Sequence, residues 1–156
     1  IDLDTSQGGD QFSLRDASGV DLVFYTGVGA AGRDLTFTVK KHVDMADDTG
    51  TTMAFTDHVY YHKQGADATV VGVGTWTRAT FTDSDGASVV LDDTEGETSS
   101  LIVIPIHADQ LGDGYSSLSV SAVVAGGSGA KIGAALAILR GLDVMRTPAN
   151  LRSALA

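Results

Sequence analysis

The chain has 156 residues and no cysteine, so it is long enough to bury the core of one domain and excludes disulfide bonds and thiolate zinc sites. Its 20 acidic residues against 10 basic ones give a net charge of -10, which opposes contact with nucleic-acid phosphate. No apolar run reaches the roughly 18 residues that span a bilayer, and we expect no signal peptide at its start. We therefore expect one domain that binds neither nucleic acid nor membranes.

Apolar and polar residues alternate along most of the chain, which is the pattern of half-buried β-strands. Runs of this kind cover, in chain order, residues 12–14, 20–25, 35–40, 53–61, 70–81, 89–91, 101–108 and 118–124. Turns rich in glycine and aspartate separate the runs, and Asp85-Gly86 suits a tight hairpin. This spacing predicts an all-β fold, an antiparallel β-sandwich of the jelly-roll kind.

Two stretches fit the pattern less well. Pro105 lies inside the run 101–108, which predicts an edge strand or a bulge there because proline cannot donate to a ladder. Residues 131–145 have apolar spacing that suits either a helix or a strand, but Gly133 and Gly141 weaken a helix. We predict a strand, paired with residues 118–124 through the loop 125–130.

The histidines and aspartates offer two candidate metal sites. His58 and His62 are four residues apart, and in a strand this spacing puts them on one face about 13 Å apart, too far for one ion unless the strand bends. Asp83 and Asp85 resemble the start of a calcium loop but lack its third ligand and its glutamate at the twelfth position. We read both as surface or turn residues and expect no cofactor, with calcium near Asp83 and Asp85 as the alternative.

Catalytic motifs are missing from the sequence. The sequence has no Gly-x-Ser-x-Gly nucleophile elbow. The residues next to His42 and His107 form no catalytic motif. The stretch 27–32 has the shape of a dinucleotide fingerprint, but a strand follows it where phosphate binding needs a helix N-terminus. We therefore expect no catalytic residues and no enzyme activity.

Aromatic residues are few, and some are candidates for partner contact. Trp76 and Arg78 share one face of their run, so either both point outward or a bulge turns Trp76 into the core. Tyr60 and Tyr61 are adjacent and point to opposite faces, so one of them is exposed. We take Tyr60, Trp76 and Arg78 as candidate contact residues.

The two ends of the chain complete the predicted organisation. We expect residues 1–9 to form an arm, residues 10–145 one β-sandwich domain, and residues 146–156 a tail whose basic charge contrasts with the acidic body. Such ends become ordered when a neighbouring subunit covers them. The candidate contacts there are Ile1, Leu3, Arg146, Pro148, Leu151 and Arg152.

Several short stretches of the sequence resemble known proteins. The stretches 54-AFTDHVYYHKQGAD-67, 74-GTWTR-78 and 114-GYSSLSVSAVV-124, followed by an Arg- and Pro-containing tail, resemble small proteins encoded among the virion structural genes of tailed bacteriophages. The resemblance implies a head decoration or cement protein that is assembled in the host cytoplasm and sits on the capsid surface. Its implied partner is the major capsid protein, with self-association around a symmetry axis as a further contact.

Two other functions fit the residues and stay open. One is a different virion component, such as a tail or fibre-base subunit. The other is a β-sandwich carbohydrate-binding or adhesin module, for which Tyr60, Tyr61, Trp76 and Tyr115 are the available aromatic side chains.

Overall fold

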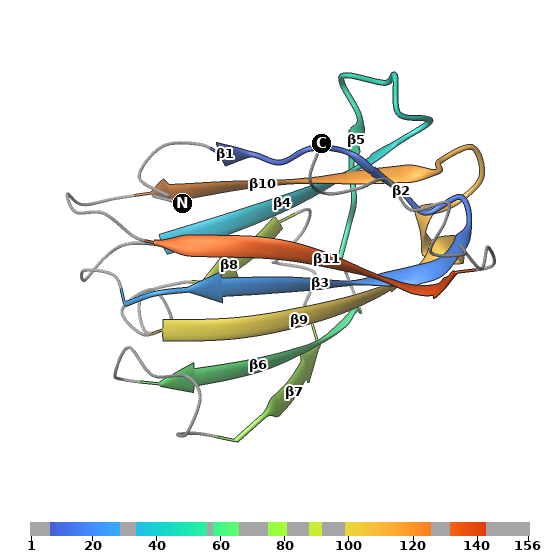
Figure 1. Cartoon of the computed structure of the whole chain (residues 1–156). Coiled ribbons are helices and arrows are strands. Elements are labelled where there is room, and N and C mark those ends of the chain that lie inside the picture. The colour runs from blue at the N-terminus through green and yellow to red at the C-terminus, as the bar shows by residue number, and fades with distance from the viewer. Residues whose placement is uncertain are drawn as a thin grey trace, which may run out of the picture.

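The protein is described by a computed structural model that covers residues 7–28, 34–55, 58–65, 75–80, 88–91, 99–125 and 132–142. These residues form two antiparallel β-sheets that pack face to face (Figure 1). The predicted all-β sandwich is confirmed, whereas its jelly-roll connectivity stays a prediction. The single helical element of the described residues is the one-turn 3-10 helix η1 (Ala108–Leu111).

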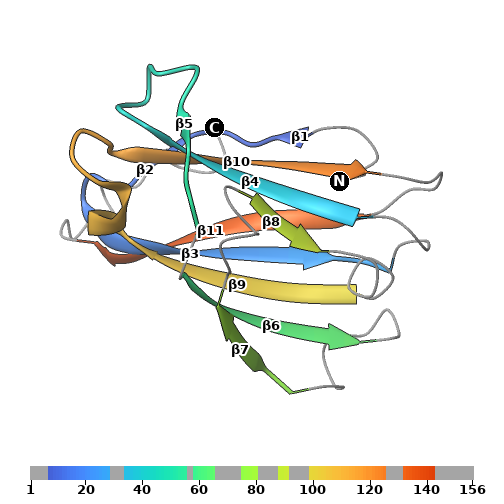
Figure 2. The ribbon, with the colours of Figure 1, turned by 180° about the vertical axis from the view of Figure 1, so that it is seen from behind.

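The first sheet has six strands around a central pair. β10 (Ser117–Ala125) pairs with β4 (Asp34–His42) along its whole length. The other edge of β10 carries β1 (Gln7–Gly8) and β2 (Phe12–Ser13), so the end of the predicted arm belongs to the sheet. The far edge of β4 carries β5 (Thr51–Thr52) and β8 (Ser88–Leu91), which Figure 2 shows from behind.

The second sheet has five strands in the order β11-β3-β9-β6-β7. Its strands are β3 (Ala17–Thr26), β6 (Val59–Gly65), β7 (Thr77–Thr80), β9 (Ser99–His107) and β11 (Gly133–Leu142). The predicted run 53–61 is therefore two pieces. Met53 and Phe55 follow β5 as buried, non-strand residues before β6 begins.

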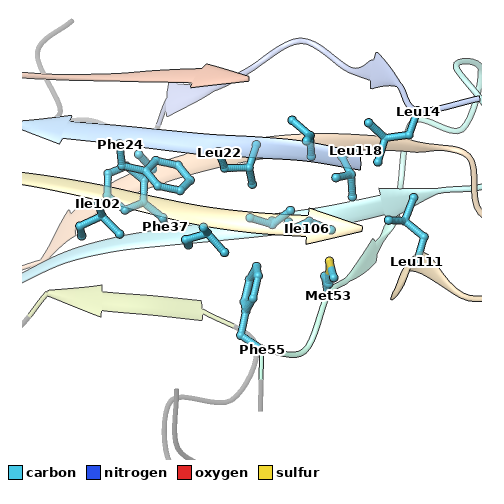
Figure 3. Packing of buried hydrophobic residues seen from close by; sticks show 14 residues of the cluster. Leu14, Leu22, Phe24, Phe37, Met53, Phe55, Ile102, Ile106, Leu111 and Leu118 are labelled. Carbon is cyan, nitrogen blue, oxygen red and sulfur yellow. The ribbon is translucent and has the colours of Figure 1, made fainter. Parts of the chain in front are cut away.

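The core fills the space between the two sheets (Figure 3). Phe24 of β3 and Phe37 of β4 meet across this space with their ring centroids 4.1 Å apart. Alternate residues of the central strands point inward, and burial of each such large apolar side chain stabilises the fold by roughly 1.5–3 kcal/mol. The other large, fully buried side chains are Leu22, Phe55, Ile102, Ile104, Ile106, Leu111 and Leu118.

Residues 133–142 form a strand as predicted, but its predicted partner is wrong. β11 pairs with β3, from Gly133 opposite Thr26 to Leu142 opposite Ala17, and not with β10. Both edges of β10 are occupied, by β4 on one side and by β1 and β2 on the other. β11 therefore joins the opposite sheet.

Pro105 lies in an interior strand, so the prediction of an edge strand is wrong. β9 pairs with β3 along most of its length and with β6 from Ser99 to Val103. The ladder with β6 ends before Pro105, and Pro105 stays opposite Asp21 of β3. In an antiparallel pair only every second residue bonds to a given neighbour, so the proline nitrogen can face the side that β6 has left.

A candidate binding face on the five-stranded sheet

The outer face of the five-stranded sheet is apolar. The strand register aligns one residue from each strand into a row, which runs Leu136, Val23, Val103, Tyr61 and Arg78 from β11 to β7. Four of these five side chains are apolar or aromatic, and the alternation of the strands directs all of them away from the core. Leu136 is 59% exposed and Tyr61 40% exposed.

The rows on either side of the first one continue this character. One contains Tyr25 and Leu101 and ends in Lys63 on β6, and the other contains Ile138 and Pro105 with Asp21 between them. Ile138 is 47% exposed, and Leu101 and Pro105 are half-buried. We call these residues, together with Leu136, Val23, Val103 and Tyr61, the outer apolar face.

The six-stranded sheet presents the opposite chemistry to solvent. Its outward positions on β10 and β4 include Ser119 opposite Lys40 and Ser121 opposite Thr38. An antiparallel sheet with one solvated face normally carries polar side chains there, so this sheet fits a surface in water. The outer apolar face does not, and a contiguous apolar patch on a folded domain marks a contact site.

Charged groups lie at the border of the outer apolar face and, at Asp21, between two of its residues. Arg140 Nε and Asp21 Oδ1 form an ion pair at 3.2 Å, in which the N–H of Nε does not make a hydrogen bond. Arg140 Nη2 donates a hydrogen bond to the carbonyl of Ile106 at 3.4 Å. Both side chains of the pair are about one-third exposed, so water screens it and its contribution to stability is below about 1 kcal/mol. Arg78 and the exposed His107 lie at other borders of the face. An apolar centre with a polar rim is the usual composition of a protein contact site.

The predicted contact residues divide between this face and other places. Trp76 is 52% exposed immediately before β7, and Arg78 is exposed, so both point outward and the alternative of a core tryptophan is wrong. One tyrosine of the adjacent pair is exposed as predicted, but it is Tyr61. Tyr60 packs against the core, so Tyr61 takes its place as the candidate contact.

The remaining predicted contacts lie outside the described residues. They are Ile1, Leu3, Arg146, Pro148, Leu151 and Arg152, together with the candidate calcium ligands Asp83 and Asp85.

Sequence reasoning missed the apolar side chains of β3, β9 and β11 on the outer face. A signal was present, because residues 101–106 and 136–139 are almost continuously apolar. Unbroken apolar runs are typical of strands that are covered on both faces, whereas half-buried strands alternate. The expectation that all strands are half-buried therefore missed the apolar residues on the outer side of β3, β9 and β11.

Ser119, His42 and Asp47 form a hydrogen-bonded group that the sequence did not indicate. The buried His42 ring makes contacts of 2.8 Å through Nε2 to Ser119 Oγ and through Nδ1 to the backbone carbonyl of Asp47. A carbonyl can only accept, so Nδ1 carries a proton and, in the neutral ring, Ser119 donates to Nε2. This order of a serine, a histidine and an acceptor resembles the hydrogen bonding of a serine nucleophile.

The same contacts serve to hold the turn that follows β4. Asp47 Oδ1 accepts from the backbone of Thr49 and Gly50, each at 3.1 Å, and from the Thr49 hydroxyl at 2.9 Å. Its Oδ2 accepts from Val43 N at 3.2 Å and lies 3.9 Å from His42 Nδ1. These hydrogen bonds, led by the one from Gly50, hold the pKa of Asp47 well below its usual range. We interpret the group as structural, because its carboxylate is committed to the turn.

The histidine of β6 and the histidine just before this strand contact aromatic rings and do not gather with carboxylates that the structure describes. No group of three or more histidines and carboxylates converges within the described residues. His58 lies against the Phe55 ring and His62 against the Tyr60 ring, each at 5.5 Å between centroids. None of the described helical residues makes a helix of the length and apolarity that crossing a bilayer requires.

A shallow hollow of about 200 Å³ opens beside β11, between the two sheets. Its lining is mainly apolar and includes Phe12, Leu22, Phe24, Val120, Ala135 and Ala137, with Asp10 as its one charged residue. It lacks a cluster of polar groups, so we read it as a packing gap and not as a site for a small polar substrate.

The comparisons with known proteins add no family to this description. No protein-family model, no curated protein and no solved structure matches the chain.

Proposed function

We propose that this chain is a non-catalytic structural domain that binds a protein surface through the outer apolar face of its five-stranded sheet. The observation that supports this proposal is the row of Leu136, Val23, Val103 and Tyr61, which extends across four adjacent strands. Apolar side chains in such a row gain free energy when a partner removes them from water, at about 25 cal/mol for each Å².

The rim of the face supports a specific partner over non-specific adhesion. Arg78 stands opposite Tyr61 at the β7 end of the row, and Arg140 stands beside Ile138 at the β11 end. Rim charges contribute more to orientation and to the rate of association than to affinity. Because Arg140 is already paired with Asp21, a partner with an acidic group near Arg78 would match this arrangement.

The resemblance to virion structural proteins suggests which partner this is. We propose a protein that decorates or cements a tailed-phage head by binding the lattice of the major capsid protein, so that its location is the capsid surface. Each copy on a closed shell makes a weak contact, and the many copies together resist the outward pressure on the shell. A rigid sandwich with one adhesive face suits this role.

Co-sedimentation tests the proposal. Purified protein is mixed with empty capsids of the candidate phage, with isolated tails, or with insoluble polysaccharide, and the pellets are compared. We expect saturable binding to the capsids alone. Binding only to tails would support a tail or fibre-base subunit, and protein that stays in the supernatant with capsids contradicts the proposal.

A carbohydrate-binding module is the second candidate, because Tyr61 and Trp76 are both exposed. Flat aromatic rings stack on sugar rings, and this needs aromatic rings in place of a broad aliphatic surface. The outer apolar face is mainly aliphatic, which favours protein contact. Saturable binding to the polysaccharide arm, lost in Trp76→Ala, would favour the carbohydrate function instead.

A further inference from the structure

β11 is the longest edge strand among the described residues. It has ten residues, whereas the other edge strands have two (β1, β2 and β5) or four (β7 and β8). Proteins usually keep edge strands short, or protect them with charge or proline, because a long apolar edge pairs with other chains. β11 contains no proline, and its one charge, Arg140, is paired with Asp21.

The hydrogen-bonding groups of the β11 edge have a known direction. Gly27 N donates to Ile132 O at 2.7 Å, so the even-numbered residues of the strand bond to β3. The backbone groups of Ala135, Ala137 and Leu139 therefore point away from β3. No described strand pairs with them.

We propose that β11 pairs antiparallel with β11 of a second copy of this chain, about a twofold axis at Ala137. The sequence 132-IGAALAILRGL-142 is nearly symmetric about this residue. On the outer side, Leu136 then faces Ile138 of the second copy, and Ile132 faces Leu142 of the second copy. These four side chains are 47–64% exposed in the single chain, and the pairing brings each into contact with its partner from the other copy.

The same register fits the inner side and the charges. Leu139 of the second copy faces Ala135, whose small side chain lines the apolar hollow of about 200 Å³. Arg140 faces Ala134 of the second copy, so no like charges meet. A twofold axis perpendicular to the sheet allows only pairs on the same face, and centring on Arg140 instead would oppose two arginines.

The size of the contact indicates a reversible dimer. One strand pair with its side chains is smaller than a standard protein interface of roughly 1,200–2,000 Å². Each copy also carries a net charge of -10, which opposes association. We therefore expect a micromolar dissociation constant that decreases as salt screens this repulsion.

The dimer would make one ten-stranded sheet and join two outer apolar faces into one surface. The inference does not depend on the proposed function, because it concerns the free protein.

The test is the mass in solution, measured by sedimentation equilibrium from about 1 to 500 µM, a range around the affinity expected of a small interface. We expect wild-type protein to approach twice 16.1 kDa. Leu136→Lys with Ile138→Lys puts like charges opposite each other twice, and we expect it to dissociate at least about tenfold more readily. Leu136→Glu with Ile138→Lys puts opposite charges at the same places and the new lysine opposite Asp21 of β3, and we expect this Lys/Glu variant to dimerise more tightly than the Lys/Lys variant.

Two controls separate this result from misfolding and from general surface effects. All these substitutions are at exposed positions, and circular dichroism with urea unfolding checks that the variants fold. Met45→Lys changes a side chain that is 54% exposed away from β11, and it should dimerise as wild type.

Three results would overturn the proposal. They are a wild-type protein that is monomeric throughout the concentration range, a Lys/Lys variant that dimerises as wild type, and a Lys/Glu variant that dissociates as readily as Lys/Lys. The last result would reject the register centred on Ala137.

Discussion

Asp47 and Gly50 hold the turn after β4 by two different physical effects. The Asp47 carboxylate accepts hydrogen bonds from three backbone amides of the turn, and Gly50 allows the chain to pass against the buried ring of His42. The backbone of Gly50 has a φ of +57°, which side chains other than glycine rarely adopt. Each effect predicts a measurable change in stability.

The hydrogen bonds to Asp47 predict a pH dependence of folding. Because they lower the pKa of this carboxyl in the folded state, they stabilise the fold above the unfolded pKa of about 3.9. That stabilisation is lost as the pH falls below this value toward the folded pKa. The difference in unfolding free energy between wild type and Asp47→Asn should therefore shrink between about pH 6 and pH 2, as measured by urea unfolding. A difference that stays constant over this range would contradict the assignment, and the exposed neighbour Asp48→Asn is the control.

A pair of glycine substitutions tests the contact with His42. A Cβ at Gly50 would lie 2.7 Å from His42 Nδ1, whereas a Cβ at Gly114, where φ is +86°, would meet nothing within 4 Å. Gly114→Ala therefore reports only the backbone strain, of roughly 1–2 kcal/mol. Gly50→Ala adds steric conflict with the ring and should destabilise the protein by roughly 1–3 kcal/mol more. Equal losses in thermal unfolding would mean that His42 moves away freely.

At the scale of the elements, local pattern predicted the strands better than their partners. Apolar runs located β3, β4, β9 and β10, with clear alternation in β4 and β10, and the alternating residues 132–138 favoured a strand over a helix for β11. The partner of β11 could not be read from the chain, because it depends on which strand edges are already occupied. The prediction from Pro105 was wrong for a similar reason. An interior strand can have a stretch that one neighbour leaves unpaired, and β6 pairs with β9 only as far as Val103.

The candidate site was predictable only in part. Strand parity put Trp76 and Arg78 on one face but left open whether a bulge turns Trp76 into the core, and it also left Tyr60 and Tyr61 undecided. Parity cannot tell which of two adjacent residues faces the core until the register with neighbouring strands is known. The group of His42 and Ser119 joins residues 77 positions apart, which no local pattern indicates.

At the scale of the whole molecule, the two outer surfaces of the sandwich differ in kind. One surface carries serine, threonine and lysine, and the other carries a row of leucine, valine and tyrosine. This asymmetry is the main support for a binding role. Leu136 and Ile138 belong both to this face and to the proposed dimer contact, whereas Tyr61 lies on β6, three strands from β11, and probes the partner contact alone.

The most direct test compares one matched substitution on each surface. Tyr61→Asp interrupts the outer apolar face, while the new carboxylate stands opposite Arg78 and keeps the sheet stable. Ser121→Asp adds the same charge to the outer face of the six-stranded sheet. In co-sedimentation with capsids, we predict that Tyr61→Asp weakens binding at least about tenfold, the effect of losing roughly 1.4 kcal/mol, and that Ser121→Asp binds as wild type. Capsid binding that survives Tyr61→Asp and is lost in Ser121→Asp would contradict the account.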